Sequence, residues 1–126
     1  PLFRRFQQSR EPKTIQDVYS RLVQQAVYFG YPADESETIT EFDAGLQTFI
    51  GRWIQTQQIK VDRVGLAQNI GRMLTLYEQH LYSPAGLSAQ DENRSVDLWR
   101  ASSQPMRKLS WIRRRQNFVN YFRPSG

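Results

Sequence analysis

Apolar residues recur at three- and four-residue steps along most of the chain, which places them on one face of an α-helix. The first such stretch follows Thr14, which has an acid, Asp17, three residues later and so has the form of a helix start; it stops at Gly30. The pattern predicts an amphipathic first helix and then a loop over residues 31–37. The expected buried face of this helix is Ile15, Val18, Tyr19, Leu22, Val23, Ala26 and Phe29.

A second helix is predicted to begin at a capping box. Thr38 and Glu41 have the spacing at which each side chain can satisfy the free backbone N–H of the other residue. Acids crowd the same helix start, where negative charge interacts well with the exposed N–H groups, and they lack the ligand pattern of a calcium loop. These acids are Asp34, Glu35, Glu37, Glu41 and Asp43, and the expected apolar face is Phe42, Leu46, Phe49, Ile50 and Trp53.

A third helix is predicted after Asp62, which is a plausible cap, and it is expected to end at the turn over residues 83–86. Gly65 and Gly71 lie inside it and each weaken a helix by about 1 kcal/mol relative to alanine. We therefore expect these two glycines to allow close contact with a neighbouring helix. The expected apolar face is Val64, Ala67, Ile70, Leu74, Tyr77 and Leu81.

Ser88 with Asp91 is expected to open a fourth helix that runs through Val96, Leu98 and Trp99. Pro105 is expected to interrupt the pattern before a fifth segment, because proline lacks the N–H that a helix interior needs. That segment contains Met106, Leu109 and Ile112. Strand signals are nearly absent. The sequence predicts an all-α fold, a single bundle of four to five helices, in which short loops favour antiparallel neighbours.

Charge is segregated along the chain. Residues 1–13 and 105–126 hold ten of the seventeen Lys and Arg residues and one acid, whereas residues 14–104 hold seven bases and eleven acids. This split predicts a neutral-to-acidic module whose two ends face a membrane surface or a nucleic acid. The expected organisation is a basic tether over residues 1–13, a helical domain over residues 14–122 and a tail over residues 123–126.

The composition of the chain excludes several kinds of chemical site. The absence of cysteine removes disulfides, thiolate zinc sites and cysteine nucleophiles, and it fits a reducing compartment. No apolar run approaches the length of a transmembrane helix, and the chain starts at Pro1 rather than Met, so we expect a soluble piece of a larger protein. Phosphate-binding glycine motifs are absent, and His80, the single histidine, has no nearby catalytic or metal-ligating partner. We expect neither an enzyme nor a bound cofactor or metal.

Residues 108–122 are the strongest functional candidate, because they mix arginines with aromatic residues. Three interpretations remain open: a solvated helix that packs its apolar side on the bundle, a helix on an anionic lipid surface, and a nucleic-acid-binding helix. Trp111, Phe118 and Phe122 fall on one side of such a helix, with Tyr121 in the same segment; Trp53 and Trp99 are expected in the core. The candidate contact surface is Arg4, Arg5, Arg10, Lys13, Arg107, Lys108, Arg113, Arg114 and Arg115.

Part of the chain resembles a known family. The stretches that carry the resemblance are Phe29-Gly30-Tyr31-Pro32, Glu37-Thr38-Ile39-Thr40-Glu41-Phe42, Leu74-Thr75-Leu76-Tyr77, Tyr82 and Leu87-Ser88. They are similar to the C-terminal domain of unknown function 4129, which follows the transglutaminase-like core in bacterial multi-pass membrane proteins. Thr38, Glu41, Tyr77 and Tyr82 stand at the positions of the family's structural motif.

The resemblance implies a parent protein with a membrane helix just ahead of this chain, so that residues 1–13 would be juxtamembrane. Basic residues flank membrane helices on the cytoplasmic side, which also favours a location at the cytoplasmic face. The cysteine of a transglutaminase-like site is not in this chain. We therefore expect a non-catalytic accessory module that contacts anionic lipid, its own parent or a further protein partner. The alternative is a small basic helical nucleic-acid-binding domain, which we expect less.

Overall fold

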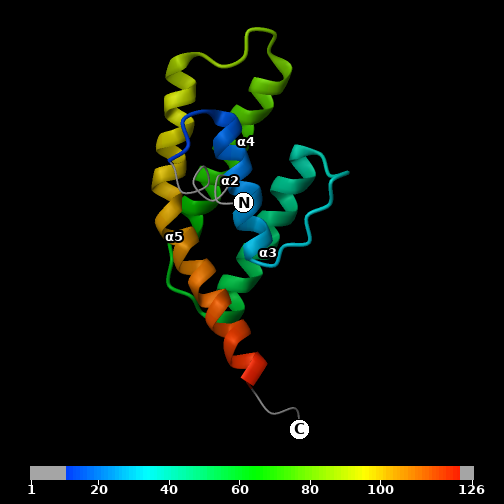
Figure 1. Cartoon of the computed structure of the whole chain (residues 1–126), viewed down its shortest axis with the longest axis vertical. Helices are drawn as coiled ribbons and strands as arrows, with labels where there is room; N and C mark the ends of the chain where they lie inside the picture. The colour runs from blue at the N-terminus through cyan, green and yellow to red at the C-terminus, as the bar shows by residue number, and fades with distance from the viewer. Residues whose placement is uncertain (1–10, 123–126) are drawn as a thin grey trace, which may run out of the picture.

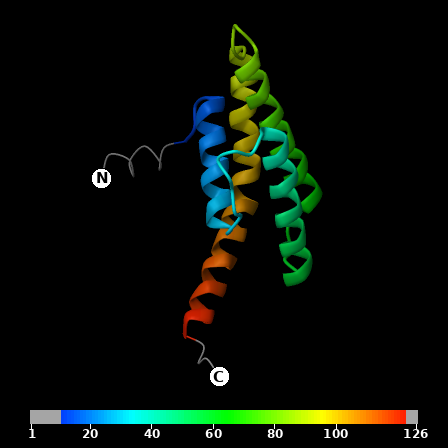
Figure 2. The same ribbon diagram turned by 90° about the vertical axis from the view of Figure 1, so that its right-hand side faces the viewer.

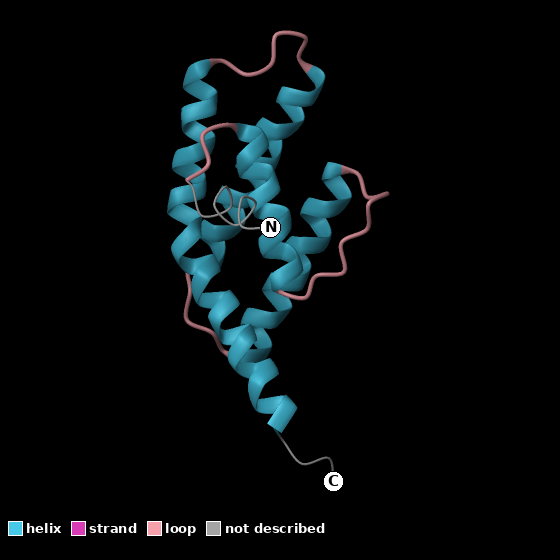
Figure 3. Ribbon diagram, viewed as in Figure 1, coloured by secondary structure: helices cyan, strands magenta, loops and turns pink. Residues whose placement is uncertain are grey.

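The computed structural model describes residues 11–122, with side chains as far as residue 117. This part of the chain forms four α-helices and no strand: α2 (Ile15–Tyr28), α3 (Ile39–Gln57), α4 (Arg63–Tyr82) and α5 (Ala89–Phe122) (Figure 1). The segments between the helices are loops and turns (Figure 3). The predicted all-α class is confirmed. Within the described residues, none of the helices combines the length and the apolar character that crossing a membrane requires.

The long helix α5 runs along most of the length of the molecule (Figure 1). α2 and α4 pack on α5 and on each other, so these three helices enclose most of the core. α3 packs mainly on α4 and makes only slight backbone contact with α2 and α5. Figure 2 shows α3 beside α4, with α2 farther from it. α3 consequently has a side that no neighbouring helix covers closely, whereas α2 is covered by two helices.

α2 has the buried face that its periodicity predicts. Its fully buried side chains are Ile15, Val18, Leu22 and Ala26, and Phe29 is buried directly after the helix. Gly30 ends the helix as predicted: it adopts a positive φ of 87°, which glycine reaches without a Cβ clash. The Gly30 and Tyr31 amides then donate to carbonyls of the last turn of α2. Local sequence therefore defines both ends of α2.

The predicted helix starts are also confirmed. The side chains of Thr14, Asp62 and Ser88 each accept a hydrogen bond from the backbone N–H three residues later, at 3.2, 3.0 and 3.1 Å. At α3 the capping box is complete: the Glu41 amide donates to Thr38 Oγ1 at 3.1 Å, and the Thr38 amide donates to the Glu41 carboxylate at 3.3 Å. Substitution of such a cap costs roughly 1 kcal/mol of stability.

The expectation that Pro105 separates two helices is wrong. α5 continues through Pro105 without a break, so the fourth and fifth predicted segments are one helix. The physical reason is a single buried stripe that extends on both sides of the proline, and the burial of its side chains offsets the roughly 3 kcal/mol that an interior proline costs. The buried positions of this stripe are Ser95, Val96, Trp99, Ser102, Met106 and Leu109.

The predicted face of α4 was partly wrong. Val64 and Leu81 are exposed. Three helices, α2, α3 and α5, pack on α4, so its buried surface is shifted away from these two residues and is wider than the predicted stripe. The buried residues of α4 are Leu66, Ile70, Met73, Leu74, Leu76 and Tyr77.

The glycines of α4 do not serve helix contact either. A Cβ added at Gly65 would meet only the side chain of Asp62, the cap of the same helix, and a Cβ at Gly71 would meet no atom within 4 Å. The close approaches occur instead at glycines of α3. Gly45 lies against the hydroxyl of Tyr31, and Gly51 lies against the guanidinium of Arg63.

Candidate functional site

Two segments that are far apart in sequence meet at one end of the molecule. Lys108 Nζ donates to the Lys60 carbonyl at 2.8 Å, and Gln116 Nε2 donates to Gln57 Oε1 at 2.9 Å. These bonds bring residues 52–63 of α3, the following loop and α4 beside residues 107–115 of α5. We call these two segments together the basic end. They contain eight Lys and Arg residues and a single acid, Asp62.

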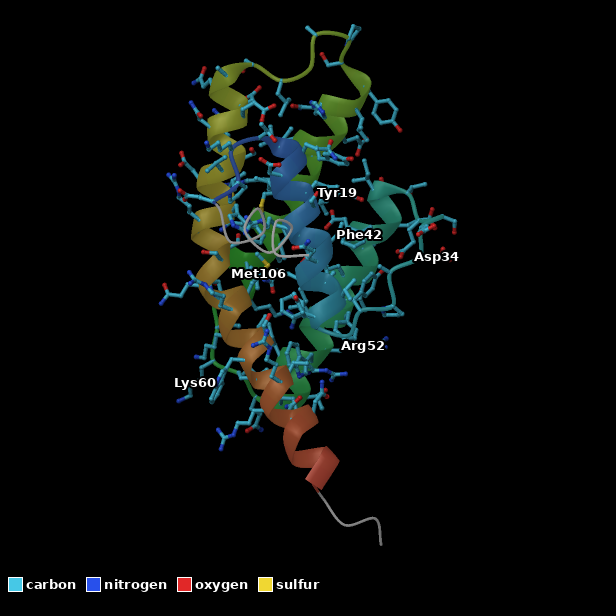
Figure 4. All side chains as sticks on the ribbon, in the orientation of Figure 1. Tyr19, Asp34, Phe42, Arg52, Lys60 and Met106 are labelled. Carbon is cyan, nitrogen blue, oxygen red and sulfur yellow. The ribbon has the colours of Figure 1, made fainter. Side chains whose placement is uncertain are left out.

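The many positive side chains of the basic end produce a positive potential that attracts anions from a distance. Four of the predicted contact residues in α5, Arg107, Lys108, Arg114 and Arg115, are exposed at this end. Figure 4 shows Lys60 projecting outward beside α5, whereas Met106 points into the interior. The bases of α3 and α4 were not among the predicted contact residues.

The part of α5 in the basic end is attached to the rest of the fold by its inner side. Leu109 is fully buried, and Ser110 Oγ donates to Gln25 Oε1 of α2 at 2.8 Å. The half-buried Arg113 packs over Gly30, where an added Cβ would lie 2.9 Å from its guanidinium nitrogen. Arg113 therefore differs from the freely exposed arginines beside it, because its guanidinium lies against the end of α2.

The outer side of the same turns combines arginines with exposed aromatic rings. Trp111 is 59% exposed. The Arg115 guanidinium lies over the Trp111 ring at 5.6 Å from its centroid, and the Arg114 guanidinium lies over the Tyr28 ring at 5.9 Å. We call Tyr28, Trp111, Arg114 and Arg115 the aromatic–arginine patch. Val27, which precedes Tyr28 in the last turn of α2, is 60% exposed.

The structure does not bring all predicted contact residues together. Lys13 lies before the start of α2, whereas Arg114 contacts the last residue of α2, and the 14 residues of this helix span about 21 Å. Lys13 is therefore remote from the basic end. Arg4, Arg5 and Arg10 lie outside the described residues, as does the tail over 123–126, and the side chains of Phe118, Tyr121 and Phe122 are not described either.

A groove of about 690 Å³ adjoins the basic end. Its walls come from the loop after α2, from the side of α3 that α4 does not cover, and from α5. Its floor contains Phe49 and Trp53, and two arginines, Arg52 of α3 and Arg113 of α5, line it as well. In the part of the chain that the structure describes, no acidic side chain lines the groove. Among the described residues, neither of these guanidinium groups has a carboxylate partner.

Trp53 is a core residue, as predicted, that also lines this groove. It is 8% exposed and packs against Phe29, with ring centroids 5.9 Å apart. Its indole Nε1 is buried and has no hydrogen-bond partner among the described residues. Leaving a buried donor unpaired costs on the order of 1–3 kcal/mol. Trp99 is buried as predicted, whereas Trp111 is not part of the core.

Tyr31 closes one side of the groove. Its hydroxyl donates to the Glu37 carboxylate at 2.8 Å, and its ring packs edge-on against Phe49 at 5.8 Å. Burial and the bond to Glu37 raise the pKa of Tyr31 to about 12. The side chain can occupy this position only because residue 45 is glycine, since a Cβ there would lie 2.1 Å from the hydroxyl oxygen.

The acidic cluster before α3 serves local structure. Asp34 accepts the Ser36 amide at 3.0 Å, and this bond lowers the pKa of the Asp34 carboxyl. The Glu37 carboxylate accepts hydrogen bonds from the Tyr31 hydroxyl and from the Asp34 amide. Figure 4 shows Asp34 at the outer edge of the molecule, away from Arg52. The described residues contain no group of three or more His, Cys, Asp or Glu side chains that is arranged to hold a metal ion.

The motif tyrosines lie in different environments. Tyr77 is buried and stacks on Tyr19 with ring centroids 3.8 Å apart, whereas Tyr82 is 79% exposed. Burial raises the pKa of Tyr19. His80 lies in the last turn of α4, packs against Tyr77 and has a buried Nδ1 without a partner in the described residues. Thr38 and Glu41 cap α3, and neither lines the groove.

Sequence analysis missed several residues of the basic end and the groove. Tyr28, Arg52, Lys60 and Arg63 lie in segments whose local patterns are ordinary, and only the packing of the helices brings them beside α5. No local signal in the sequence would have identified them. The chain matches no family model, no curated protein and no solved structure. The resemblance to the domain of unknown function 4129 therefore stays a prediction that rests on the residues quoted for it.

Proposed function

We propose that this chain is a non-catalytic module that binds an anionic membrane surface through its basic end. The aromatic–arginine patch is the observation that carries this proposal. Tryptophan and tyrosine rings favour the headgroup layer of a bilayer, and arginines beside them attract anionic lipid. Each base near an anionic leaflet contributes about 1 kcal/mol, so the eight bases of the basic end supply a substantial attraction together.

The exposed apolar surface favours lipid over nucleic acid. Trp111 and Tyr28 could stack on unpaired bases, but Val27 has no polar atom and gains nothing from a phosphate backbone. A hydrocarbon side chain that is 60% exposed beside the patch gains free energy when it enters the boundary between headgroups and acyl chains. We therefore favour a lipid surface and treat nucleic-acid binding as an outcome of the test.

The resemblance stated above extends this proposal to the parent protein. We infer that the helices form a single bundle of antiparallel neighbours at the cytoplasmic face of a transglutaminase-like multi-pass membrane protein. The basic end would then hold the module against the same bilayer that anchors the parent. Residues 1–13 would supply the connection, and other parts of the parent or a separate protein would contact the remaining surface.

Sedimentation with lipid vesicles tests the proposal directly. The chain is mixed with phosphatidylcholine vesicles with and without phosphatidylserine, and in parallel with duplex DNA at the same ionic strength. We expect binding that depends on phosphatidylserine, weakens with salt and exceeds the binding to DNA. The double variant Arg114→Ala/Arg115→Ala should bind roughly 30-fold more weakly, at about 1 kcal/mol for each charge.

The matched control is Arg72→Ala/Arg94→Ala, which removes the same charge from exposed positions of α4 and α5 outside the basic end. This control variant should bind almost as well as the unsubstituted chain. Trp111→Ala should weaken binding without changing net charge. Preferential binding to DNA would replace the proposal with a nucleic-acid function, and an equal loss in both double variants would show that net charge rather than the patch controls binding.

A further inference from the structure

We propose that the groove beside the basic end binds a single-chain amphiphile with a carboxylate head, such as a long-chain fatty acid. The groove differs from the aromatic–arginine patch, because it lies between α3, α5 and the loop after α2 rather than on the outer side of α5. The inference does not require the chain to bind a membrane.

The shape and lining of the groove fit this class of ligand. Its volume of about 690 Å³ lies within the range of small-molecule sites. Phe49, Trp53, Tyr31 and Pro32 provide apolar surface for a hydrocarbon chain. The groove is open to solvent, and its lining follows α3 from Ala44 to Gln57, which suits a linear ligand that keeps its polar head in contact with water.

The charged groups of the groove select the head of the ligand. Arg52 and Arg113 reach it from different helices, and in the described part of the chain neither forms an ion pair. A guanidinium donates two parallel hydrogen bonds to the two oxygens of a carboxylate, which is a strong and directional contact. Arg113 is the better placed of the two, because its packing over Gly30 fixes its position before a ligand arrives.

The lining of the groove also suits an anionic ligand because, among the described residues, it contains no acidic side chain. Glu37, the acid that contacts a lining residue, is bonded to the Tyr31 hydroxyl and does not itself line the groove. Among the described residues, the groove therefore offers an anionic head two positive groups and no negative group. The unpaired Trp53 Nε1 is buried beneath the surface, so we assign the head to the arginines and only the apolar contact to the indole ring.

The test is a titration of the full chain with laurate below the concentration at which laurate forms micelles. Binding is followed by calorimetry and by tryptophan fluorescence, in a Trp111→Phe background so that the exposed tryptophan outside the groove does not contribute. We expect saturable binding of laurate and a raised thermal unfolding temperature, because a ligand that binds only the folded state stabilises it. A lowered unfolding temperature would mark a detergent effect and would overturn the proposal.

Variants and analogues then define the site. Arg113→Gln and Arg52→Gln should each weaken laurate binding at least about tenfold, the loss of a charge-assisted hydrogen bond, while Arg72→Gln, on α4 outside the groove, should leave it unchanged. Dodecyl maltoside, which has the same chain and a neutral head, should bind more weakly than laurate. Equal binding of the maltoside, or insensitivity to both groove arginines, would overturn the assignment of the head. Tighter binding of dodecyl phosphate than of laurate would overturn the choice of a carboxylate.

Discussion

The helices α2 and α3 begin in the same way but end up in different surroundings. A threonine caps each of them, and each carries an apolar face with helical periodicity. α2 packs on both α4 and α5, and the centre of its apolar face, from Ile15 to Ala26, is fully buried. α3 packs mainly on α4 and leaves Phe49 half-buried. A helix with two close neighbours completes the core, and a helix with one leaves an apolar side that can line a groove.

The different packing of α2 and α3 also gives two neighbouring aromatic residues different surroundings. Phe29, directly after α2, is fully enclosed, whereas its neighbour Trp53 in α3 has one edge on the groove. Stability and ligand binding are therefore expected to depend on different helices. Substitutions that compare the two helices can test this division, and the expected effects below run from the largest to the smallest.

Phe29→Ala should have the largest effect, a loss of about 4 kcal/mol in the free energy of unfolding, because a fully enclosed ring leaves a cavity that cannot collapse. Trp53→Ala should cost about 3 kcal/mol, at the low end for a buried tryptophan, because the groove beside it gives the surrounding side chains room to relax. Urea denaturation measures both values. A larger loss for Trp53→Ala would contradict the view that α3 lies at the edge of the core.

The two threonine caps provide a smaller contrast. Thr38→Ala should lower stability by about 1 kcal/mol, and Thr14→Ala by no more than that, because only Thr38 belongs to a reciprocal capping box. Thr38→Ser keeps the hydroxyl and serves as the control. Hydrogen exchange of the first-turn amides gives a second measurement, and α3 should fray more than α2 after loss of its cap. Equal fraying would mean that neighbours do not decide the stability of these helix ends.

Local features could be predicted from the sequence because they depend on residues close in the chain. The caps at Thr14, Thr38, Asp62 and Ser88 involve side chains and amides three residues apart, and the buried face of α2 follows from its periodicity. Pro105 was misjudged because the burial that keeps α5 continuous comes from other helices.

The candidate site was predictable only in part for the same reason. The α5 segment has a visible mixture of arginines and aromatic residues, and most of its bases are exposed in the structure. Arg52 and Lys60 join it only through contacts between helices. The groove consists of residues from three separate segments, so no local pattern describes it.

Glycine replacement tests how closely the loop after α2 approaches α3. Gly71→Ala should stabilise the protein by up to about 1 kcal/mol, because the site has free space and alanine is the better helix former. Gly45→Ala gains the same propensity but displaces Tyr31, so it should gain less or lose stability. In a Tyr31→Phe background, which removes the clashing oxygen, Gly45→Ala should recover part of the gain. Equal gains at both glycines would show that the loop does not press on α3.

The last expected effect appears only at alkaline pH and concerns the response of this loop. Burial and the bond to Glu37 raise the pKa of Tyr31 from its ordinary value of 10 to about 12, so the folded state favours the protonated hydroxyl. The corresponding stability is fully present below about pH 10 and is lost as the pH rises toward 12. Tyr31→Phe should therefore make the fall in the urea midpoint above pH 10 less steep, without abolishing it, because the pKa of Tyr19 is also raised. Tyr82→Phe, at an exposed position of α4, is the control and should leave the slope unchanged. An unchanged slope for Tyr31→Phe would show that the Tyr31 hydroxyl titrates alike in the folded and unfolded states, so that its burial and its bond to Glu37 add no pH-dependent stability to the loop beside α3.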